Sequence, residues 1–437
     1  MTKFEVINNN LVIVAFIAFC FLWGLNAGNY FDFDIRLLIF LPLPLILVKI
    51  YEDLKKKEYI IFKILSLFIL LIIVHYVLAA DKNIKDFLKL ILFVIAVGYL
   101  FCFAYYYHLF ILNNKIKIIF LFYVLFAMSL ILSMFVGLPI SEPFSCGAPK
   151  NFSITKQLTF TIKEFFFFEN SHFGMISVSL LLTSIFYLIK KKLFVMFKIF
   201  FFIFIIIFFL KTSSTLIAGV IFCSVAFLLM EKKRMDKIFF YVVILINFFF
   251  ITIFLSDDIC KAKLVPKYNN EYYIKNDKVY QNISNILNVS QGSLSSAVFF
   301  HAANLTYHSL KNKPFGWGFQ NYQSAFINYN KEFPPKNKLL ISLNEKDGTN
   351  NFFKLIVEFG IFGFLIYLFI AYSFWSKNIS LENKLFLFPF IITQSIRGAG
   401  YFNGGFILIL IIIVMLQLNS NKKYNKKETI NLHVNQT

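Results

Sequence analysis

The sequence predicts an all-α protein that crosses a membrane many times. Hydrophobic residues make up 59% of its 437 residues and charged residues only 15%, whereas about a quarter of an average soluble domain is charged. A membrane helix needs about 20 apolar residues, so the hydrophobic share would supply roughly a dozen. Apolar runs fall at about 11–25, 35–50, 59–79, 87–109, 118–138, 172–189, 193–210, 213–230, 237–255, 352–375, 384–396 and 402–418. We therefore expect about twelve transmembrane helices, in which every backbone amide is satisfied internally.

Positive charge is concentrated in the short connectors between the apolar runs. If the N-terminus is cytoplasmic, the connectors 51–58, 110–117, 190–192, 231–237 and 376–384 hold fourteen Lys or Arg residues, and the short connectors on the other side hold four. Because cytoplasmic loops carry such an excess, both termini are expected inside the cell. Membrane topology thus accounts for the net charge of +20, and no nucleic-acid partner is expected.

The connectors also define the predicted organisation of the chain. N-terminal membrane helices occupy 1–138, a medium outer loop 139–171 and central membrane helices 172–255. A large outer loop follows at 256–351, then C-terminal membrane helices at 352–418 and a cytoplasmic tail at 419–437. A loop of about 96 residues in a compact membrane protein usually carries function.

The five cysteines show no spacing typical of a metal site. Cys20, Cys102 and Cys223 lie inside apolar runs, where a free cysteine behaves as a small packing residue. Cys146 and Cys260 fall in the two expected outer loops and could form a disulfide there. No metal and no cofactor are expected.

The end of the large loop contains a first group of polar candidates. Asp347 begins a turn that leads to Asn350 and Asn351 at an expected helix start, where asparagine can cap the helix and can also offer amide donors to a ligand. Lys354 and Glu358 follow at a spacing of four, which places them on one helix face. The alternative is an ordinary capped helix that enters the bilayer.

A second candidate is Arg397, in the segment SIRGAGYFNGG that spans residues 395–405 and includes Tyr401. The chain has only three arginines, and an arginine at a membrane interface is costly enough to suggest a function. Its planar guanidinium suits a phosphate group. The alternative is an arginine that only reaches the phosphates of membrane lipids.

Two further polar groups lie at expected outer helix starts. Glu169 and His172 belong to the segment ENSHFG, and His172 could act as a phosphate or sugar ligand or as a general base. Lys211 precedes a run of hydroxyl residues and could bind an anion together with free helix amides. A hydrogen-bonded surface histidine and a plain helical-hairpin turn are the respective alternatives.

Within the large loop, the segment KNKPFGWGFQNY at 311–322 combines glycines, aromatic rings and amides. Gly316, Trp317 and Gly318 are candidate carbohydrate-binding residues on this basis. His301 and His308 are seven residues apart and could share a helix face, but a zinc site needs further ligands.

Several common functions lack their sequence signature. The chain has no phosphate-binding glycine loop of a nucleotide engine, and charged residues do not stud the middle of the spans, as they do in many ion-coupled transporters. Polar residues gather instead at the outer face. This distribution favours a site for a lipid-linked substrate outside the cytoplasm over a translocation path.

The ordered set of segments resembles the O-antigen polymerase/ligase family of bacterial envelope glycosyltransferases. The matching segments are ENSHFG at 169–174, KTSSTL at 211–216, KPFGWGFQNY at 313–322, DGTNNFFKLIVEFGIFG at 347–363 and SIRGAGYFNGG at 395–405. The resemblance implies a GT-C-like membrane fold with one long periplasmic loop late in the chain. It also implies an inner-membrane enzyme whose active site faces the periplasm.

The two activities of the family differ at one position. Ligases carry a His-Asn pair nine residues before a GxxG motif, and here Gly360 and Gly363 place Thr349-Asn350 at that pair. The missing histidine favours a polymerase of the Wzy type over a ligase. Many relatives also carry Ser-Arg-Thr where this chain has Lys211 and two hydroxyl residues, so Lys211 is expected to take the phosphate role.

The resemblance implies a metal-independent polymerase that joins undecaprenyl-diphosphate-linked repeat units. Arg397 would hold the diphosphate, and Glu169, His172 or Asp347 would serve as general base. The implied substrate-binding residues are Lys211, Asn350, Asn351, Gly316, Trp317, Gly318 and Tyr401. Membrane lipid, a chain-length regulator and a flippase are the expected partners. The alternatives are an O-antigen ligase acting on lipid A-core and, from another class, a flippase for a lipid-linked oligosaccharide.

Overall fold

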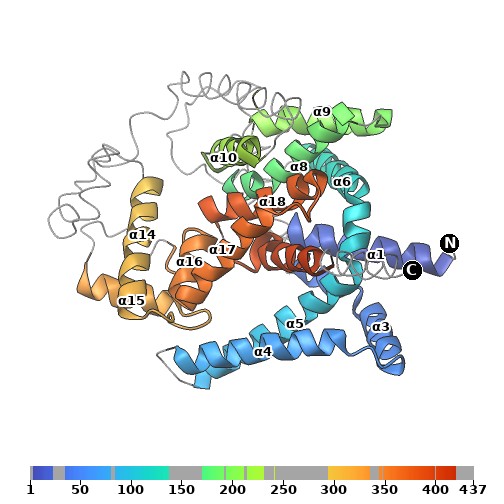
Figure 1. The fold of residues 1–437 in the computed structure, drawn as a ribbon. Coiled ribbons are helices and arrows are strands. Elements are labelled where there is room, and N and C mark those ends of the chain that lie inside the picture. The colour runs from blue at the N-terminus through green and yellow to red at the C-terminus, as the bar shows by residue number, and fades with distance from the viewer. Residues whose placement is uncertain are drawn as a thin grey trace, which may run out of the picture.

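The computed structural model describes residues 3–22, 35–79, 84–136, 170–190, 193–210, 214–230, 241, 294–334, 344–346, 348–398 and 400–419. Every regular element in these ranges is a helix (Figure 1). The all-α prediction is therefore confirmed for the part of the chain that the structure describes.

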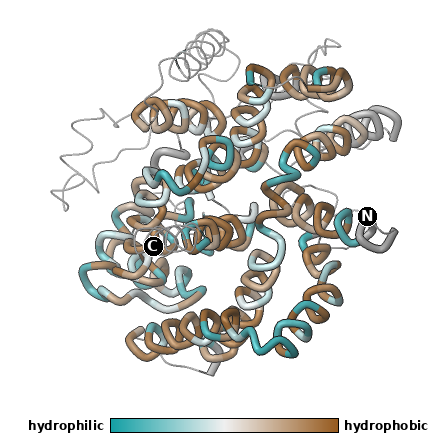
Figure 2. The backbone as a smooth tube through the Cα atoms, turned by 45° about the vertical axis from the view of Figure 1, so that its right-hand side comes forward, coloured by the Kyte–Doolittle hydropathy of each residue, from teal (hydrophilic) through white to brown (hydrophobic). Residues whose placement is uncertain are grey.

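The first half of the chain supplies a set of apolar helices. They are α1 (Lys3–Cys20), the short 3-10 helix η1 (Ile35–Phe40), α3 (Leu43–Lys55), α4 (Ile60–Leu78), α5 (Ile84–Asn113) and α6 (Lys115–Val136). Hydrophobic residues run along most of the helices, and hydrophilic residues gather at connecting segments (Figure 2). This pattern is the one expected of helices in lipid.

The second half provides the centre of the molecule and a separate helical pair. Its elements are α8 (Asn170–Lys190), α9 (Val195–Leu210), α10 (Ser214–Met230), α14 (Leu294–Asn312), α15 (Tyr322–Glu332), α16 (Asn351–Phe359), α17 (Ile361–Trp375), α18 (Leu381–Ile396), η5 (Asn403–Gly405) and a last helix over 406–419. Helix α18 packs against α8, α10 and α16 and lies among them (Figure 1).

Three of the described helices are long and apolar enough to cross a membrane: Ile60–Leu78, Asp86–Asn113 and His172–Lys190. Only 17% of the residues in the first span are buried by protein, against 78% in the last. Helix α4 is thus at the periphery, where its exposed leucines would face lipid, and α8 is central. Shorter apolar helices lie at Asn8–Cys20, Val195–Ile206, Thr215–Met230, Ile361–Trp375 and Asn403–Asn419. The helical membrane class is supported, and the number twelve stays a prediction.

Two predicted spans differ in the structure. The run 35–50 is broken by a turn at Leu41-Pro42 into η1 and the 13-residue helix α3, because a proline early in a helix cannot continue the preceding turn. The run 352–375 is broken at Gly360, whose φ of 59° ends α16 before α17 begins. Helix α17 is one of the shorter apolar helices, whereas α16, with nine residues, is not among them. The run 237–255 falls outside the described residues except for Tyr241.

Polar contacts at the helix ends fall into two groups. Segments predicted on the outside contact one another, through Arg36 with Asn403, His75 with the Phe315 carbonyl, and Lys89 with Asn321. Segments predicted on the inside also contact one another, in the pairs Asn10–Lys117, Lys115–Asn383, Tyr187–Glu382 and His108–Asn419. Helix ends predicted on the same side of the membrane thus contact one another, as expected if successive helices cross it in alternating directions.

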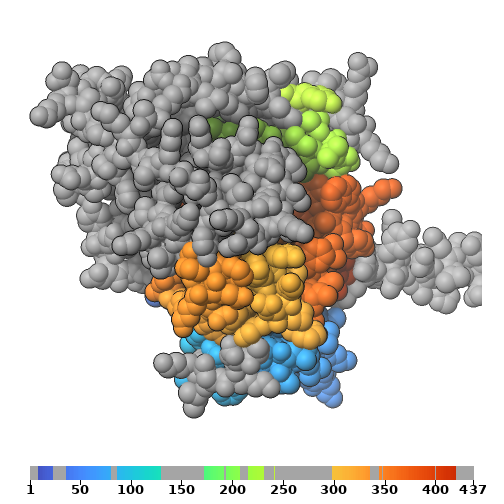
Figure 3. All heavy atoms as spheres, turned by 90° about the vertical axis from the view of Figure 1, so that its left-hand side faces the viewer, coloured from blue at the N-terminus to red at the C-terminus, as the bar shows by residue number. Residues whose placement is uncertain are grey.

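Helices α14 and α15 form a pair with its own small core. Figure 3 shows them side by side on one face of the molecule. The core is built mainly from aromatic side chains and joins the pair to α16; its members are Leu305, Trp317, Tyr322, Ala325, Phe326, Tyr329 and Val357. This pair is the described part of the large predicted loop, and it positions the segment that packs on α16.

Candidate functional site

The start of α16 is capped by one of the predicted binding residues. Asn350 has an extended backbone, and its side-chain oxygen accepts a hydrogen bond of 2.8 Å from the Phe353 amide. This is a standard N-cap, as the sequence indicated. The Asn350 side-chain nitrogen is buried without a hydrogen-bond partner among the described residues. A buried amide donor of this kind is costly, and a ligand oxygen would satisfy it.

The 395–405 segment packs directly on this helix start. The Gly398 amide donates to the Thr349 carbonyl at 3.0 Å, and a Cβ atom on Gly398 would lie 2.7 Å from both the amide nitrogen and the side-chain oxygen of Asn351. Asn351 in turn donates to Gln394 at 3.1 Å, and Gln394 donates to the Gly404 carbonyl at 2.8 Å. The glycine at 398 is needed for this close approach.

The other end of α16 is covered by the 313–321 segment. The Trp317 amide donates to the Val357 carbonyl and the Gly318 amide to the Glu358 carbonyl, each at 3.0 Å. Gly316 has a φ of 88°, and a Cβ atom there would overlap the Glu358 carbonyl. The backbone of this segment therefore continues the hydrogen bonding of the helix, which requires glycine where the two chains touch.

Trp317 is almost fully enclosed. Its ring is 8% exposed and belongs to the small aromatic core, while the Lys313 ammonium lies 3.6 Å from the ring centroid. Its indole nitrogen is buried without a hydrogen-bond partner among the described residues. The structure thus assigns Gly316, Trp317 and Gly318 a packing role, and their predicted contact with carbohydrate stays a prediction.

A buried carboxylate connects these two segments. Glu358 is 0% exposed; it accepts a short hydrogen bond from the Tyr401 hydroxyl and one of 3.0 Å from the Gln320 amide. The Lys354 ammonium lies 4.0 Å from its second oxygen and donates to the Lys346 carbonyl at 2.6 Å. Burial raises the pKa of Glu358, and the Lys354 charge and the two hydrogen bonds oppose this rise. Burial likewise raises the pKa of Tyr401 well above its usual value.

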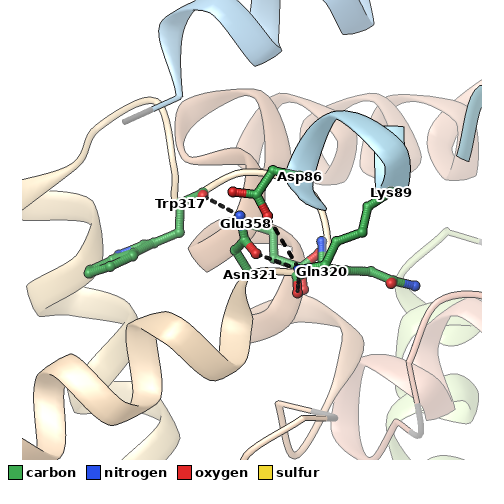
Figure 4. Close-up of polar contacts among 6 residues, drawn as sticks. All are labelled: Asp86, Lys89, Trp317, Gln320, Asn321 and Glu358. Carbon is green, nitrogen blue, oxygen red and sulfur yellow. Dashed lines mark hydrogen bonds and ion pairs between the residues drawn. The ribbon is translucent and has the colours of Figure 1, made fainter. Parts of the chain in front are cut away.

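The 313–321 segment is also held from the side of α5 (Figure 4). The Lys89 ammonium donates to the Asn321 side chain at 2.8 Å and pairs with Asp86 at 3.3 Å. The Asn321 side chain itself donates to the Trp317 carbonyl at 3.2 Å. Figure 4 shows these side chains near Glu358. The segment that donates to the carboxylate through the Gln320 amide is therefore also held by α5.

Arg397 lies next to the cap of α16. It is the C-terminal cap of α18, half-buried, with an extended backbone (φ −141°, ψ 119°), and it precedes Gly398. His172 lies in the first turn of α8. One turn before Arg397, Thr393 donates to the Met175 carbonyl of α8 at 2.7 Å, and a Cβ atom on Gly219 of α10 would lie 2.7 Å from the Thr393 methyl group. The starts of α8, α10 and α16 therefore converge near Arg397.

This convergence has an electrostatic consequence. The first amides of a helix carry a partial positive charge and lack intrahelical partners. Three such helix starts thus lie on the side of the bundle where α18 ends at Arg397. An anion, and a phosphate in particular, is the ligand that such an arrangement favours.

An apolar cavity of about 390 Å³ begins beside Arg397 and runs between α10, α17 and α18. Its walls are almost entirely hydrophobic side chains, and the lining residues are Phe222, Ala226, Phe352, Tyr367, Ile370, Ala371, Phe374, Trp375, Phe388, Ile391, Ile392, Ser395 and Ile396. Ser395 and Ile396 directly precede Arg397. A molecule with a hydrocarbon chain and a phosphate group would match an apolar cavity followed by an arginine.

Residues 199–368 match the Wzy_C family model, which is described as O-antigen ligase. The match confirms the family resemblance that the motifs indicated. It begins within α9, covers α10, the large loop, α16 and part of α17, and ends before Arg397. No curated protein and no solved structure matches the chain.

Several predicted site residues lie outside the described part of the chain. They are Glu169, Lys211 and Asp347, together with the possible disulfide partners Cys146 and Cys260. The described residues bring together Asn350, Asn351 and Tyr401 around α16, with Arg397 adjacent. His172 belongs to the neighbouring helix start of α8.

The remaining histidines and cysteines have structural surroundings. His301 and His308 share a helix face and both stack near Tyr329, at ring distances of 5.3 and 5.5 Å. Cys20, Cys102 and Cys223 are buried, as expected for packing residues. Within the described ranges, no three His, Cys, Asp or Glu residues gather as a metal site would require.

Sequence reasoning missed two parts of the candidate site. Arg36 of η1 donates to the Asn403 side chain and so anchors the end of the 395–405 segment. Glu358 is the centre of the buried cluster, although only its spacing from Lys354 was visible in the sequence. Both were charged residues in apolar surroundings, which is the one signal that could have identified them.

Proposed function

We propose that this protein is an O-antigen or related surface-polysaccharide polymerase, which joins undecaprenyl-diphosphate-linked repeat units at the outer face of the bacterial inner membrane. The observation that carries the proposal is the Wzy_C match across the region that builds α16 and its covering segment. The helical membrane architecture supports it, since the substrate is lipid-linked.

In this proposal the donor diphosphate binds against Arg397. The guanidinium and the helix starts of α8, α10 and α16 supply positive charge, and His172 or Lys211 assists. The apolar cavity that begins at Ile396 takes part of the polyprenyl chain. The buried Asn350 amide donor and Asn351 orient the sugar or the diphosphate.

The chemistry is a displacement at the anomeric carbon. A hydroxyl of the acceptor glycan attacks that carbon, its proton passes to a general base, and undecaprenyl diphosphate departs with the bonding electrons. Positive charge around the diphosphate stabilises the departing anion in the transition state. Glu169, His172 and Asp347 are the candidate bases, and the step as drawn uses neither a metal nor a nucleotide.

The polymerase is preferred to the ligase because of Thr349. The ligase pattern places a histidine there, and this chain has a buried threonine with a φ of 65°. A ligase using the same donor with lipid A-core as acceptor is the second candidate. A flippase for the lipid-linked oligosaccharide is the third, and the concentration of polar residues around α16 argues against it.

The proposed topology has both termini in the cytoplasm and the site in the periplasm. Membrane segments at 1–138, 172–255 and 352–418 alternate with outer loops at 139–171 and 256–351 and are followed by a cytoplasmic tail. Membrane lipid surrounds the helices. A chain-length regulator and the flippase that delivers the repeat units are the proposed protein partners.

The test compares surface polysaccharide on gels from a deletion strain and from strains that express the wild type, Arg397→Ala or Arg234→Ala. Arg234 lies in a predicted cytoplasmic loop and is the matched control. We expect the deletion and Arg397→Ala to leave lipid A-core with a single repeat unit, and Arg234→Ala to restore long chains. Long chains that accumulate on undecaprenyl diphosphate would instead indicate a ligase. Repeat units that remain on the cytoplasmic side, or an unchanged glycan, would refute glycan transfer.

A further inference from the structure

Two segments that are distant in sequence meet on the short helix α16. The 313–321 segment pairs its backbone with the C-terminal end of the helix, and the 395–405 segment packs along it. The only carboxylate on α16 is Glu358, and its side chain contacts both segments, accepting hydrogen bonds from the Gln320 amide and the Tyr401 hydroxyl.

These contacts fix the 397–401 stretch at two points. Gly398 is bound to the Thr349 carbonyl at the start of α16, and Tyr401 is bound to Glu358 at the other end. Arg397 precedes the first anchor by one residue. The orientation of Arg397 relative to the Asn350 cap therefore depends on how firmly this stretch is held.

The bond at Glu358 is stronger than a neutral one would be. Its acceptor is 0% exposed and lies 4.0 Å from the Lys354 ammonium, which favours the ionised carboxylate, and hydrogen bonds to charged groups are about twice as strong as neutral pairs. Lys354 also lies within 5.5 Å of the centre of the Tyr401 ring. A glutamine would keep the shape and an acceptor oxygen but lose this charge.

We propose that Glu358 is a positioning residue, which holds the Arg397–Tyr401 stretch and the 313–321 segment on α16 in the arrangement that glycan transfer requires. The catalytic part of this inference rests on the proposed function. Glu358 is 0% exposed and accepts hydrogen bonds from Gln320 and Tyr401, so in this proposal it acts through Arg397 and the capping asparagines rather than on the substrate.

The chain offers a chemically similar but more exposed control, one-third exposed, at the opposite end of α18. Glu382 accepts a hydrogen bond of 2.6 Å from the Tyr187 hydroxyl and lies 3.5 Å from the Lys115 ammonium. It repeats the set of glutamate, tyrosine and lysine found around Glu358. Glu382→Gln therefore removes the same kind of charge without touching the 395–405 segment.

The first experiment measures hydrogen–deuterium exchange of the full-length protein in lipid nanodiscs. In Glu358→Gln we expect exchange of residues 395–405 and 313–322 to become at least about tenfold faster, with α8 unchanged, because two tethers are weakened. Glu382→Gln should leave both regions unchanged. If Glu358→Gln folds poorly because the buried Lys354 charge is left without its carboxylate, the double variant Lys354→Met/Glu358→Gln removes that charge as well. Residues 395–405 and 313–322 should still exchange fast in the double variant. Wild-type exchange at 395–405 in a folded variant would overturn the proposal.

The second experiment measures polymerisation of a purified lipid-linked repeat unit by the same proteins. Misplacement of a positioned group by about 1 Å costs on the order of a hundredfold in rate, so we expect kcat to fall at least tenfold in Glu358→Gln while KM changes less than threefold. A kcat equal to that of Glu382→Gln would overturn the positioning role. A wild type that lacks transfer activity would refute the proposed function. Because the exchange experiment uses no substrate, it would still test whether Glu358 holds the two segments on α16.

Discussion

At the scale of single residues, the buried Glu358 side chain receives hydrogen bonds from protein groups in place of water. Glu358 obtains them from Tyr401 and Gln320, which lie 43 and 38 residues away in the sequence. The spacing of Lys354 and Glu358 on one helix face could be predicted, because helix geometry is local. Their burial and the other two partners could not, because those depend on how three segments pack.

A residue-scale prediction concerns His301, which is 3% exposed. Burial lowers the pKa of this histidine to about 4. The unfolded chain takes up this proton near pH 6.5 and the folded protein does so only near pH 4, so stability is lost as the pH falls through this window. The full loss is about 3 kcal/mol. Thermal unfolding in nanodiscs from pH 7.5 to 4.5 should show it.

The His301→Phe variant is the control for this prediction. It keeps an aromatic ring against Phe326 and Tyr329 and removes the titrating group. Carboxylates titrate near pH 4 in both proteins, so the informative quantity is the difference between their melting temperatures. A difference that stays constant from pH 7.5 to 4.5 would contradict the prediction.

At the scale of elements, the apolar run 352–375 looked like one membrane helix and is two. Both helices are rich in phenylalanine, leucine and isoleucine, but α16 also carries Lys354 and Glu358, whereas α17 has no charged residue. The break occurs at Gly360, whose φ is 59°. The backbone at Gly360 lies so close to the Pro314 carbonyl that a Cβ atom on residue 360 would overlap the carbonyl oxygen. Glycine adopts such a φ without steric cost, and the packing of the 313–321 segment against it leaves no room for a larger residue.

The element-scale prediction concerns the contact between the end of α18 and the start of α16. In Gly398→Ala the new Cβ atom would lie 2.7 Å from two atoms of Asn351, so the two elements must separate. We expect a loss of stability of about 1–3 kcal/mol, typical of overpacking, and a strong loss of long glycan chains on gels. A variant with normal chain length would show that this contact is not needed for activity.

Gly98→Ala is the matched control. Gly98 lies within α5 and has no atom within 4 Å of an added Cβ, and alanine favours a helix interior by up to about 1 kcal/mol over glycine. Melting temperature and glycan pattern of this variant should therefore equal or exceed those of the wild type. The comparison separates the effect of a methyl group from the effect of its location.

At the scale of the whole molecule, the charge pattern and the contacts agree on which helix ends lie together. The lysine-rich connectors predicted a common inner side, and Lys115 and Lys117 do contact Asn383 and Asn10. Likewise Lys89 and Arg36 meet segments predicted on the outer side. A charge rule that acts during insertion thus anticipates contacts that form in the folded protein.

The whole-molecule prediction concerns orientation. Single cysteines are introduced at the exposed positions Asn312, at the end of α14, and Lys56, after α3, in a background without native cysteines. Because lysine-rich loops are retained inside, a membrane-impermeant maleimide should label Asn312→Cys in intact spheroplasts. It should label Lys56→Cys only after permeabilisation, and the reverse pattern would refute the proposed topology.

The sequence by itself determined the class of the protein, its helical segments, the side on which each connector is expected and the family it resembles. These follow from local properties, namely hydrophobic run length, charge in the connectors and short motifs. It also indicated the cap at Asn350 and the candidacy of Arg397. Tertiary structure alone decided that α16 is a separate helix, that the 313–321 and 395–405 segments close around it, and that Glu358 joins them. The physical reason is that a buried charge is stable only when distant parts of the chain supply its partners, and that the close backbone contacts at Gly316 and Gly360 form only when those parts pack together.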